Sequence, residues 1–178
     1  VTGFLTMLRE LGLSSPSVSR NFSAVKSFHK FLNGEQVTKI NPVQNIDSPK
    51  LSKTLPDVLN QEEIEAILSQ PNIIEPLGIR DKAILETMYA TGIRVSELTS
   101  LKQSNVHASE NIVRVFGKGS KERLVPIGRS ALDWIEKYSR QVRTKLSARG
   151  SGQDVLFLNA RGKPMSRMAV WNIVHQYT

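Results

Sequence analysis

The sequence predicts a mainly α-helical fold with a small antiparallel β-sheet, an α+β arrangement spread over two domains. Apolar residues recur at helical spacing through most of the 178 residues. Between Asn105 and Ile127 the apolar period changes to two, and a glycine-rich turn interrupts the segment, which is typical of a β-hairpin. From Asn41 to Pro56 the periodicity is poor and three prolines occur, so this stretch separates two parts of the chain.

Two helices are expected in the N-terminal part, which we place at residues 1–47. The first starts at Thr2 and stops at Gly12, and its apolar stripe consists of Phe4, Leu5, Leu8 and Leu11. The second starts at residues 14–17, where Pro16 suits a first turn, and continues to about residue 32. Its inward face is expected to hold Val18, Phe22, Val25, Leu32 and either Phe28 or His29.

Residues 48–57 are expected to form an extended linker to a second domain at residues 58–178. Proline fixes φ and removes an amide donor, which favours a tether over a regular element. The alternative is a long surface loop within one domain.

In the second domain, Asn60 followed by Glu63 is similar to a capping box and predicts a helix start. The expected helices cover about residues 60–68, 79–89, 94–101 and 131–146, and a last one starts after Ser166. The helix at 79–89 is expected to turn Ala83, Ile84, Met88 and Tyr89 inward. The sheet is expected to have three strands and to begin near Val106.

The composition favours a polyanionic partner. The net charge is +8, which points first to nucleic acid, although a merely basic soluble protein is the alternative. Without cysteine, disulfides and thiolate metal sites are excluded. No apolar run approaches the ~20 residues that span a bilayer, so we expect a cytoplasmic protein with no membrane partner.

Arg94 is a candidate phosphate ligand. It follows the Thr91-Gly92 break at the start of a short helix, and a guanidinium stays charged and fits phosphate oxygens in pairs. The alternative is a surface arginine paired with Glu97, one turn further on.

A second candidate is Lys118, which lies between two glycines in the predicted hairpin turn. The glycines let a phosphate backbone approach closely, and an ammonium could donate a proton to a leaving oxygen or simply hold a phosphate. Lys121 and Arg123 extend the basic cluster, for which a solvated turn is the alternative. A nucleotide-binding P-loop is excluded, because Ile112 occupies the position of its first glycine and strand leads to strand.

The remaining reactive side chains predict no further site. His29, His107 and His175 do not have metal-ligand spacing. Tyr177 could be considered as a nucleophile, but a helix residue that touches the core is the favoured interpretation.

Two runs in this order resemble the tyrosine recombinase (phage integrase) family, and the bacterial Xer type most closely. The run LETMYATGIRVSEL at residues 85–98 is similar to the segment that holds the family's first catalytic arginine. The run GKGSKERLVP at 117–126 is similar to its catalytic-lysine hairpin. Shorter similarities to Xer recombinases occur at residues 48–50, 80–82 and 154–157.

This resemblance implies a partial helical core-binding domain at residues 1–47 and a partial catalytic domain at 58–178, which clamp duplex DNA at a specific recombination site. The implied reaction breaks and rejoins DNA through a 3′-phosphotyrosyl intermediate, without cofactor or metal. Arg94 would stabilise charge on the phosphate, Lys118 would protonate the 5′ leaving oxygen, and Glu97 would orient Arg94. The basic residues expected to contact DNA are Lys121, Arg123, Lys50, Lys53, Arg20 and Lys26.

The chain departs from the family pattern in one respect. The family's His-x-x-Arg motif does not occur in it, and the nucleophilic tyrosine is expected further downstream, so none is assigned and the chain alone is expected to be inactive. The family also implies a homo- or hetero-tetramer on DNA in the full-length protein, acting in chromosome-dimer resolution or in mobile-element integration and excision. The alternatives are a non-catalytic DNA-binding protein on the same scaffold and a basic helical adaptor for protein partners.

Overall fold

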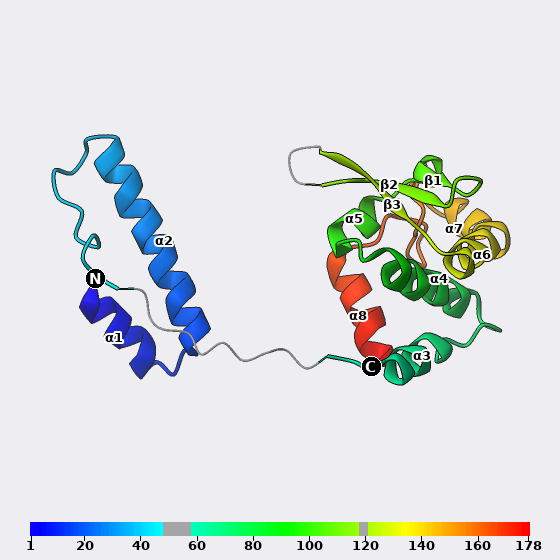
Figure 1. Ribbon diagram of the computed structural model, residues 1–178, viewed down its shortest axis with the longest axis horizontal. Coiled ribbons are helices and arrows are strands. Elements are labelled where there is room, and N and C mark those ends of the chain that lie inside the picture. The colour runs from blue at the N-terminus through cyan, green and yellow to red at the C-terminus, as the bar shows by residue number, and fades with distance from the viewer. Residues whose placement is uncertain (48–57, 118–120) are drawn as a thin grey trace. The chain divides into compact units, whose positions relative to one another are not determined.

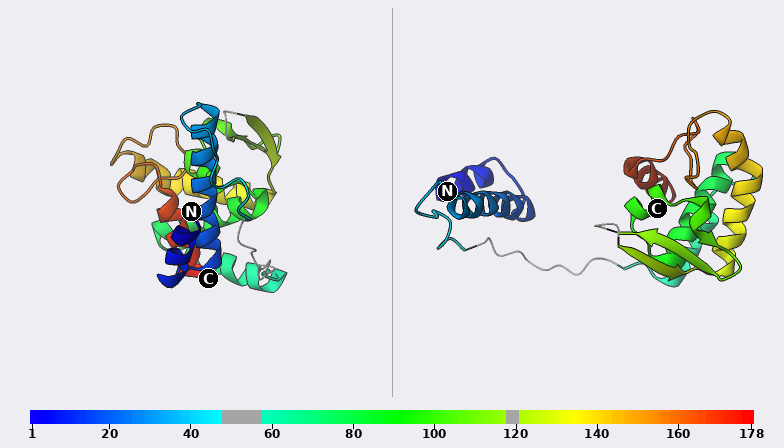
Figure 2. Two further views of the ribbon diagram at one scale, coloured as in Figure 1. Left: turned by 90° about the vertical axis from the view of Figure 1, so that its left-hand side faces the viewer. Right: turned by 90° about the horizontal axis from the view of Figure 1, so that it is seen from above.

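A computed structural model describes residues 1–47, 58–117 and 121–178 (Figures 1 and 2). The chain divides into two units, Val1–Asp57 and Val58–Thr178. The described residues are mainly helical with one small antiparallel sheet, so the predicted fold class is confirmed. The expected linker with Lys50 and Lys53, and the predicted turn residue Lys118, lie outside the described residues.

The first unit contains helices α1 (Thr2–Glu10) and α2 (Ser15–Gly34), with Pro16 in the first turn of α2. Its small core consists of Leu5, Leu8, Val18, Phe22 and Val43. In the first stripe Phe4 and Leu11 are 37% and 66% exposed, so only part of it is buried. Of the two alternatives in the second stripe, His29 is half-buried whereas Phe28 is 57% exposed. The fully buried residues of α2 lie in its N-terminal half, and the later stripe residues Val25 and Leu32 are half-buried.

The second unit begins with α3 (Gln61–Ser69), α4 (Pro76–Thr91) and α5 (Val95–Ser100). The predicted capping box starts α3, since Asn60 and Glu63 each accept the other's backbone amide. Helix α4 starts earlier than predicted, because Pro76 fits its first turn. Tyr89 was predicted to point inward but is 57% exposed, since it lies about 140° around the helix from the buried Ile84.

A left-handed glycine sets the angle between α4 and α5. Gly92 ends α4 with φ 58°, and its amide bonds to the Met88 carbonyl. Residues with a β-carbon rarely adopt this left-handed backbone conformation, whereas glycine adopts it without steric cost. The turn directs the chain into α5 with Arg94 at its N-cap.

The sheet has the order β1-β2-β3, with all neighbours antiparallel. After a short 3₁₀ turn (Gln103–Asn105), the strands are β1 (Val106–His107), β2 (Ile112–Phe116) and β3 (Glu122–Pro126). Val113 and Val115 of β2 point into the core, and their partners on β3 are Val125 and Arg123. Arg123 therefore lies on the core-facing side of the sheet.

The predicted helix at 131–146 is present as α6 (Arg129–Tyr138), a π-helical turn (Ser139–Arg143) and α7 (Thr144–Ser147). The last helix is α8 (Arg167–Tyr177), whose predicted cap Ser166 accepts the Ala169 amide. No helix among the described residues combines the length and apolar character that crossing a membrane would need.

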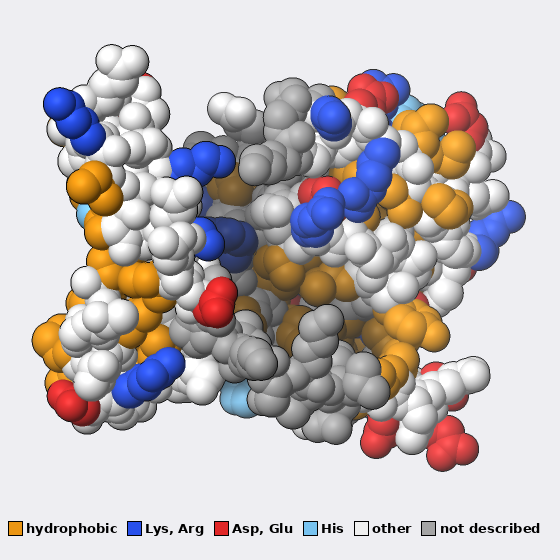
Figure 3. All heavy atoms as spheres, turned by 60° about the vertical axis from the view of Figure 1, so that its left-hand side comes forward, with side chains coloured by type: hydrophobic (Ala, Val, Ile, Leu, Met, Phe, Trp, Pro, Cys, Tyr) orange, Lys and Arg blue, Asp and Glu red, His pale blue; other side chains and the backbone are white. Residues whose placement is uncertain are grey.

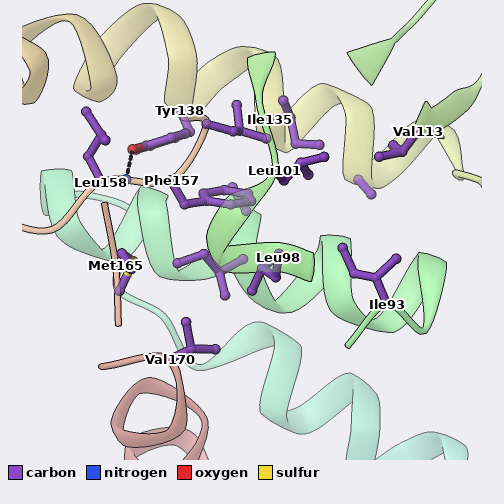
Figure 4. Close-up of a cluster of buried hydrophobic side chains, with 14 of the residues drawn as sticks. Ile93, Leu98, Leu101, Val113, Ile135, Tyr138, Phe157, Leu158, Met165 and Val170 are labelled. Atoms are coloured by element: carbon purple, nitrogen blue, oxygen red, sulfur yellow. Dashed lines mark hydrogen bonds between the residues drawn. The ribbon is translucent and has the colours of Figure 1, made fainter. Parts of the chain in front are cut away.

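An irregular segment, residues 153–158, enters the core of the second unit at its end, where Leu156, Phe157 and Leu158 are buried (Figure 4). The Leu158 amide donates to the hydroxyl of the fully buried Tyr138 at 3.0 Å, and the Tyr138 and Phe157 rings stack. The Arg143 guanidinium donates to the carbonyls of Gln153, Val155 and Leu156. These bonds satisfy backbone groups that have no sheet partner, which lets a non-regular segment remain buried.

Candidate functional site

An open cleft of about 670 Å³ lies where the start of α5 meets the β2–β3 hairpin. Its described lining residues are Arg94, Ser96, Glu97, Phe116, Gly117, Lys121, Glu122 and Arg123. The structure thus brings together four residues that the sequence analysis singled out. In Figure 3 a row of Lys and Arg side chains (blue) crosses the surface of the second unit.

Glu97 is the buried centre of this cleft. Its side chain is 2% exposed, and one of its oxygens accepts the Arg94 backbone amide at 2.7 Å. Because a guanidinium has no acceptor, this bond is one half of a capping box, in which the N3 carboxylate holds the N-cap amide. The local sequence of α5 therefore fixes both the helix start and the position of Glu97 under Arg94.

Two arginines share the Glu97 carboxylate. Arg94 Nη1 lies 3.2 Å from Oε1, and Arg123 Nη2 lies 2.9 Å from Oε2. Burial by itself raises the pKa of the Glu97 carboxyl, but the hydrogen bonds from Arg94 and the charges of both arginines outweigh it and hold the pKa below its usual 4.5. Glu97 is therefore ionised at neutral pH, and the three side chains together carry one net positive charge.

Arg94 remains open to a ligand although it is paired. Its side chain is 71% exposed, and one guanidinium nitrogen reaches Glu97. The pairing with Glu97, which was the alternative to phosphate binding, is thus present and leaves most of the donor fork facing solvent. The Arg94 backbone amide, in contrast, is occupied by Glu97 and is not available to an anion.

Arg123 has a contact that the sequence analysis missed. It was predicted as a DNA contact, yet its guanidinium reaches the buried Glu97 while its side chain is 42% exposed. The signal was present in the strand alternation, which places Arg123 on the same face as Val125 and not with the outward Leu124. The sequence alone could not show that Arg123 contacts Glu97, because the two residues are 26 positions apart.

The base of the hairpin turn lies against the same carboxylate. The Gly117 amide donates to the Lys121 carbonyl at 2.8 Å, and a β-carbon at Gly117 would lie 3.7 Å from Glu97 Oε1. Lys118, the next residue, lies outside the described residues. Gly117, which directly precedes it, is close to the Glu97 carboxylate that holds Arg94.

Among the other predicted DNA contacts, Lys121 is exposed and lines this cleft. Arg20 and Lys26 are exposed on α2 of the first unit. Six helical positions separate them by about 120° around the axis, so they do not form one stripe.

Tyr177 lies in a different environment. It packs against the core, and its hydroxyl donates to the Asp81 carboxylate at 3.2 Å. Burial raises the pKa of the Tyr177 hydroxyl, and the neighbouring Asp81 carboxylate raises it further. The cavity that Tyr177 lines, about 570 Å³ in volume, shares no described lining residue with the Arg94 cleft.

No group of three or more His, Cys, Asp or Glu side chains that could hold a metal ion occurs in residues 1–47, 58–117 and 121–178.

The chain is similar to curated proteins over nearly all of its length. It is 49% identical over 177 residues to the tyrosine recombinase XerD of Chlorobaculum tepidum, covering 98% of this chain and 58% of that protein. It is 42% identical over 178 residues to the XerD of Oceanobacillus iheyensis, covering 100% of this chain and 60% of that protein. The chain thus spans about three fifths of the length of these relatives.

Solved structures share the fold. The XerH site-specific recombinase bound to its difH substrate matches with a TM-score of 0.78 at 19% identity, covering 99% of this chain and 51% of that one. The Tn1549 transposon integrase in complex with circular intermediate DNA matches with a TM-score of 0.72 at 17% identity, covering 98% of this chain and 61% of that one.

The model of the phage integrase family matches residues 57–178, which include the whole described part of the second unit. The match contains both runs on which the resemblance was based, and the curated relatives are Xer-type tyrosine recombinases. This chain belongs to the phage integrase family of tyrosine recombinases.

Proposed function

We propose that this chain forms the greater part of a site-specific recombinase that breaks and rejoins duplex DNA through a 3′-phosphotyrosyl intermediate. The observation that carries the proposal is the Arg94 guanidinium, which is anchored on the buried Glu97 and open to solvent in a cleft that Gly117 and Lys121 also line. Family membership and the relatives named as recombinases support it.

The proposed chemistry is phosphoryl transfer. Charge gathers on the non-bridging oxygens of the scissile phosphate, and a fixed guanidinium stabilises that charge more strongly in the transition state than in the ground state. Arg94 has this role in the proposal, and Glu97 holds it in place. Lys118 donates the proton that the 5′ oxygen needs when it leaves. The nucleophilic tyrosine is not assigned to any residue of this chain.

The proposed partner is duplex DNA that carries a specific recombination site. The XerH structure holds its difH substrate, and a lambda integrase structure shows a tetramer bound to a Holliday junction. We extend both features to the full-length protein, with DNA as the substrate and a tetramer as the active assembly. Since the curated relatives are Xer-type recombinases, we place chromosome-dimer resolution ahead of mobile-element integration.

The test uses the full-length gene product and a nicked suicide substrate built on the site that the protein selects from random duplexes. A covalent protein–DNA band that survives denaturation, with the protein on a 3′ phosphate and a free 5′ hydroxyl, is expected. A protein that binds its selected site tightly and yields no such band, or that is linked to the 5′ end, would refute the proposal.

A further inference from the structure

We propose that Arg123 is a positioning residue, which neutralises Glu97 so that the charge of Arg94 is left for the phosphate. This role differs from a DNA contact and rests on the proposed function. It concerns three side chains that the structure places on one carboxylate: Arg94, Glu97 and Arg123.

The strand geometry directs Arg123 toward the protein. Its cross-strand partner is Val115, which is 2% exposed, and the inward Val125 follows two residues later. On a pleated strand these positions share one face. The Arg123 guanidinium therefore reaches Glu97 Oε2 at 2.9 Å from the inner side of the sheet, beside the Arg94 amide on the same oxygen.

The Arg123–Glu97 contact changes the net charge around Arg94. A buried carboxylate is costly unless it is paired, and Glu97 has two arginine partners. If Arg123 is removed, Arg94 becomes the single arginine on a buried negative charge, and the two side chains together are neutral. Arg94 is then drawn toward Glu97 and stabilises developing charge on a phosphate less well.

The same contact joins two elements. Arg123 lies on β3, whereas Glu97 and Arg94 lie on α5 and at its N-cap. The Gly117–Lys121 bond closes the turn immediately beside this link. Arg123 therefore also keeps the β2–β3 hairpin next to the helix that carries Arg94.

The experiment compares three variants of the full-length gene product: Arg123→Gln, Arg123→Lys and the matched control Arg114→Gln. Arg114 is an arginine of the same sheet, similarly exposed, but its strand partner is the outward Leu124 and it pairs with Glu122. Single-turnover cleavage of the suicide substrate at saturating DNA, the Kd and its salt slope are measured for each.

We expect Arg123→Gln to slow cleavage by about 10- to 100-fold, the effect of losing one hydrogen bond to a charged group. Its Kd and salt slope should match those of Arg114→Gln, and Arg123→Lys should restore part of the rate. The opposite pattern overturns the proposal: normal cleavage at saturation, with weaker binding and a salt slope smaller by about 0.9, the mark of one lost phosphate contact.

A double variant tests the electrostatic argument. Glu97→Gln removes the charge that Arg123 neutralises, so adding Arg123→Gln to it should cause little further loss of rate. If the two losses multiply instead, Arg123 acts independently of Glu97 and the proposal is wrong.

A measurement that does not depend on DNA cleavage tests the role of Arg123 separately from the proposed recombinase activity. The carboxyl pKa of Glu97, followed by NMR, should rise in Arg123→Gln and stay unchanged in Arg114→Gln. The other charged residues of the cleft, Arg94, Lys121 and Glu122, remain in both variants. Failure of the wild type to form the covalent adduct would refute the proposed function, whereas an unchanged Glu97 pKa would refute the role of Arg123.

Discussion

Glu97 shows how a short sequence run builds a site. Its spacing from Arg94 makes it both the helix-capping carboxylate and the partner of the Arg94 side chain. The Glu97 carboxylate thereby holds both the start of α5 and the Arg94 side chain in place. A carboxylate that is 2% exposed is tolerated because three donors surround it.

This arrangement predicts how stability depends on pH. Since the folded-state pKa of Glu97 is depressed below 4.5, its stabilising contribution is present above that pH and is lost as the pH falls through the folded-state pKa. The difference in free energy of unfolding between wild type and Glu97→Gln should therefore shrink as the pH is lowered from neutral to below 4.5. Urea unfolding at several pH values measures it.

Glu136→Gln serves as the control, because Glu136 is 57% exposed and pairs with Arg140 on the surface. Its difference from wild type should change little over the same pH range. A Glu97→Gln difference that stays constant with pH would contradict the account.

Lys118 gives a chemical prediction. Lys118→Ala should slow cleavage of a normal substrate, because the 5′ oxygen then leaves without a proton donor. A substrate with a bridging sulfur at that position needs no proton and should recover much of the rate. Equal losses on both substrates in single-turnover assays would show that Lys118 is not the acid.

Sequence reasoning at this scale identified Arg94, Glu97 and the hairpin cluster from local spacing. It could not assign Arg123 to Glu97, because that contact depends on how β3 approaches α5. Buried Arg143 was not singled out for the same reason: its partners are backbone carbonyls ten or more residues away.

At the scale of elements, periodicity and capping signals located most helices and all three strands. The misses have physical causes. The start of α4 depended on Pro76, and the π-helical turn at 139–143 has the same apolar spacing as an ordinary helix over so short a stretch. The irregular segment 153–158 has no regular ladder, so periodicity could not describe its bonds.

Arg143 should be essential to that segment. Arg143→Met keeps the apolar stem but leaves the buried Leu156 carbonyl and two part-buried carbonyls without a donor, which should cost about 2–3 kcal/mol. Arg140→Met is the control, since Arg140 is 79% exposed on the same π-helical turn and should change stability by less than about 0.5 kcal/mol. Similar unfolding midpoints for the two variants would contradict this role.

At the scale of the whole molecule, the net charge of +8 indicated a polyanionic partner before any motif was considered. It predicts DNA binding through phosphates, with log affinity falling with log salt by about 0.9 for each phosphate contacted. Titration of a labelled duplex at several salt concentrations measures the slope. Affinity that is indifferent to salt would contradict phosphate binding.

The central claim is that Arg94, held by Glu97, stabilises charge on the scissile phosphate. It is tested most directly by single-turnover cleavage of the suicide substrate with Arg94→Ala and Arg114→Ala versions of the full-length gene product, each at saturating DNA. We expect Arg94→Ala to lower the rate by about 10²- to 10³-fold with a Kd close to that of Arg114→Ala, which itself should cleave normally. An Arg94→Ala protein that cleaves as fast as Arg114→Ala would contradict it.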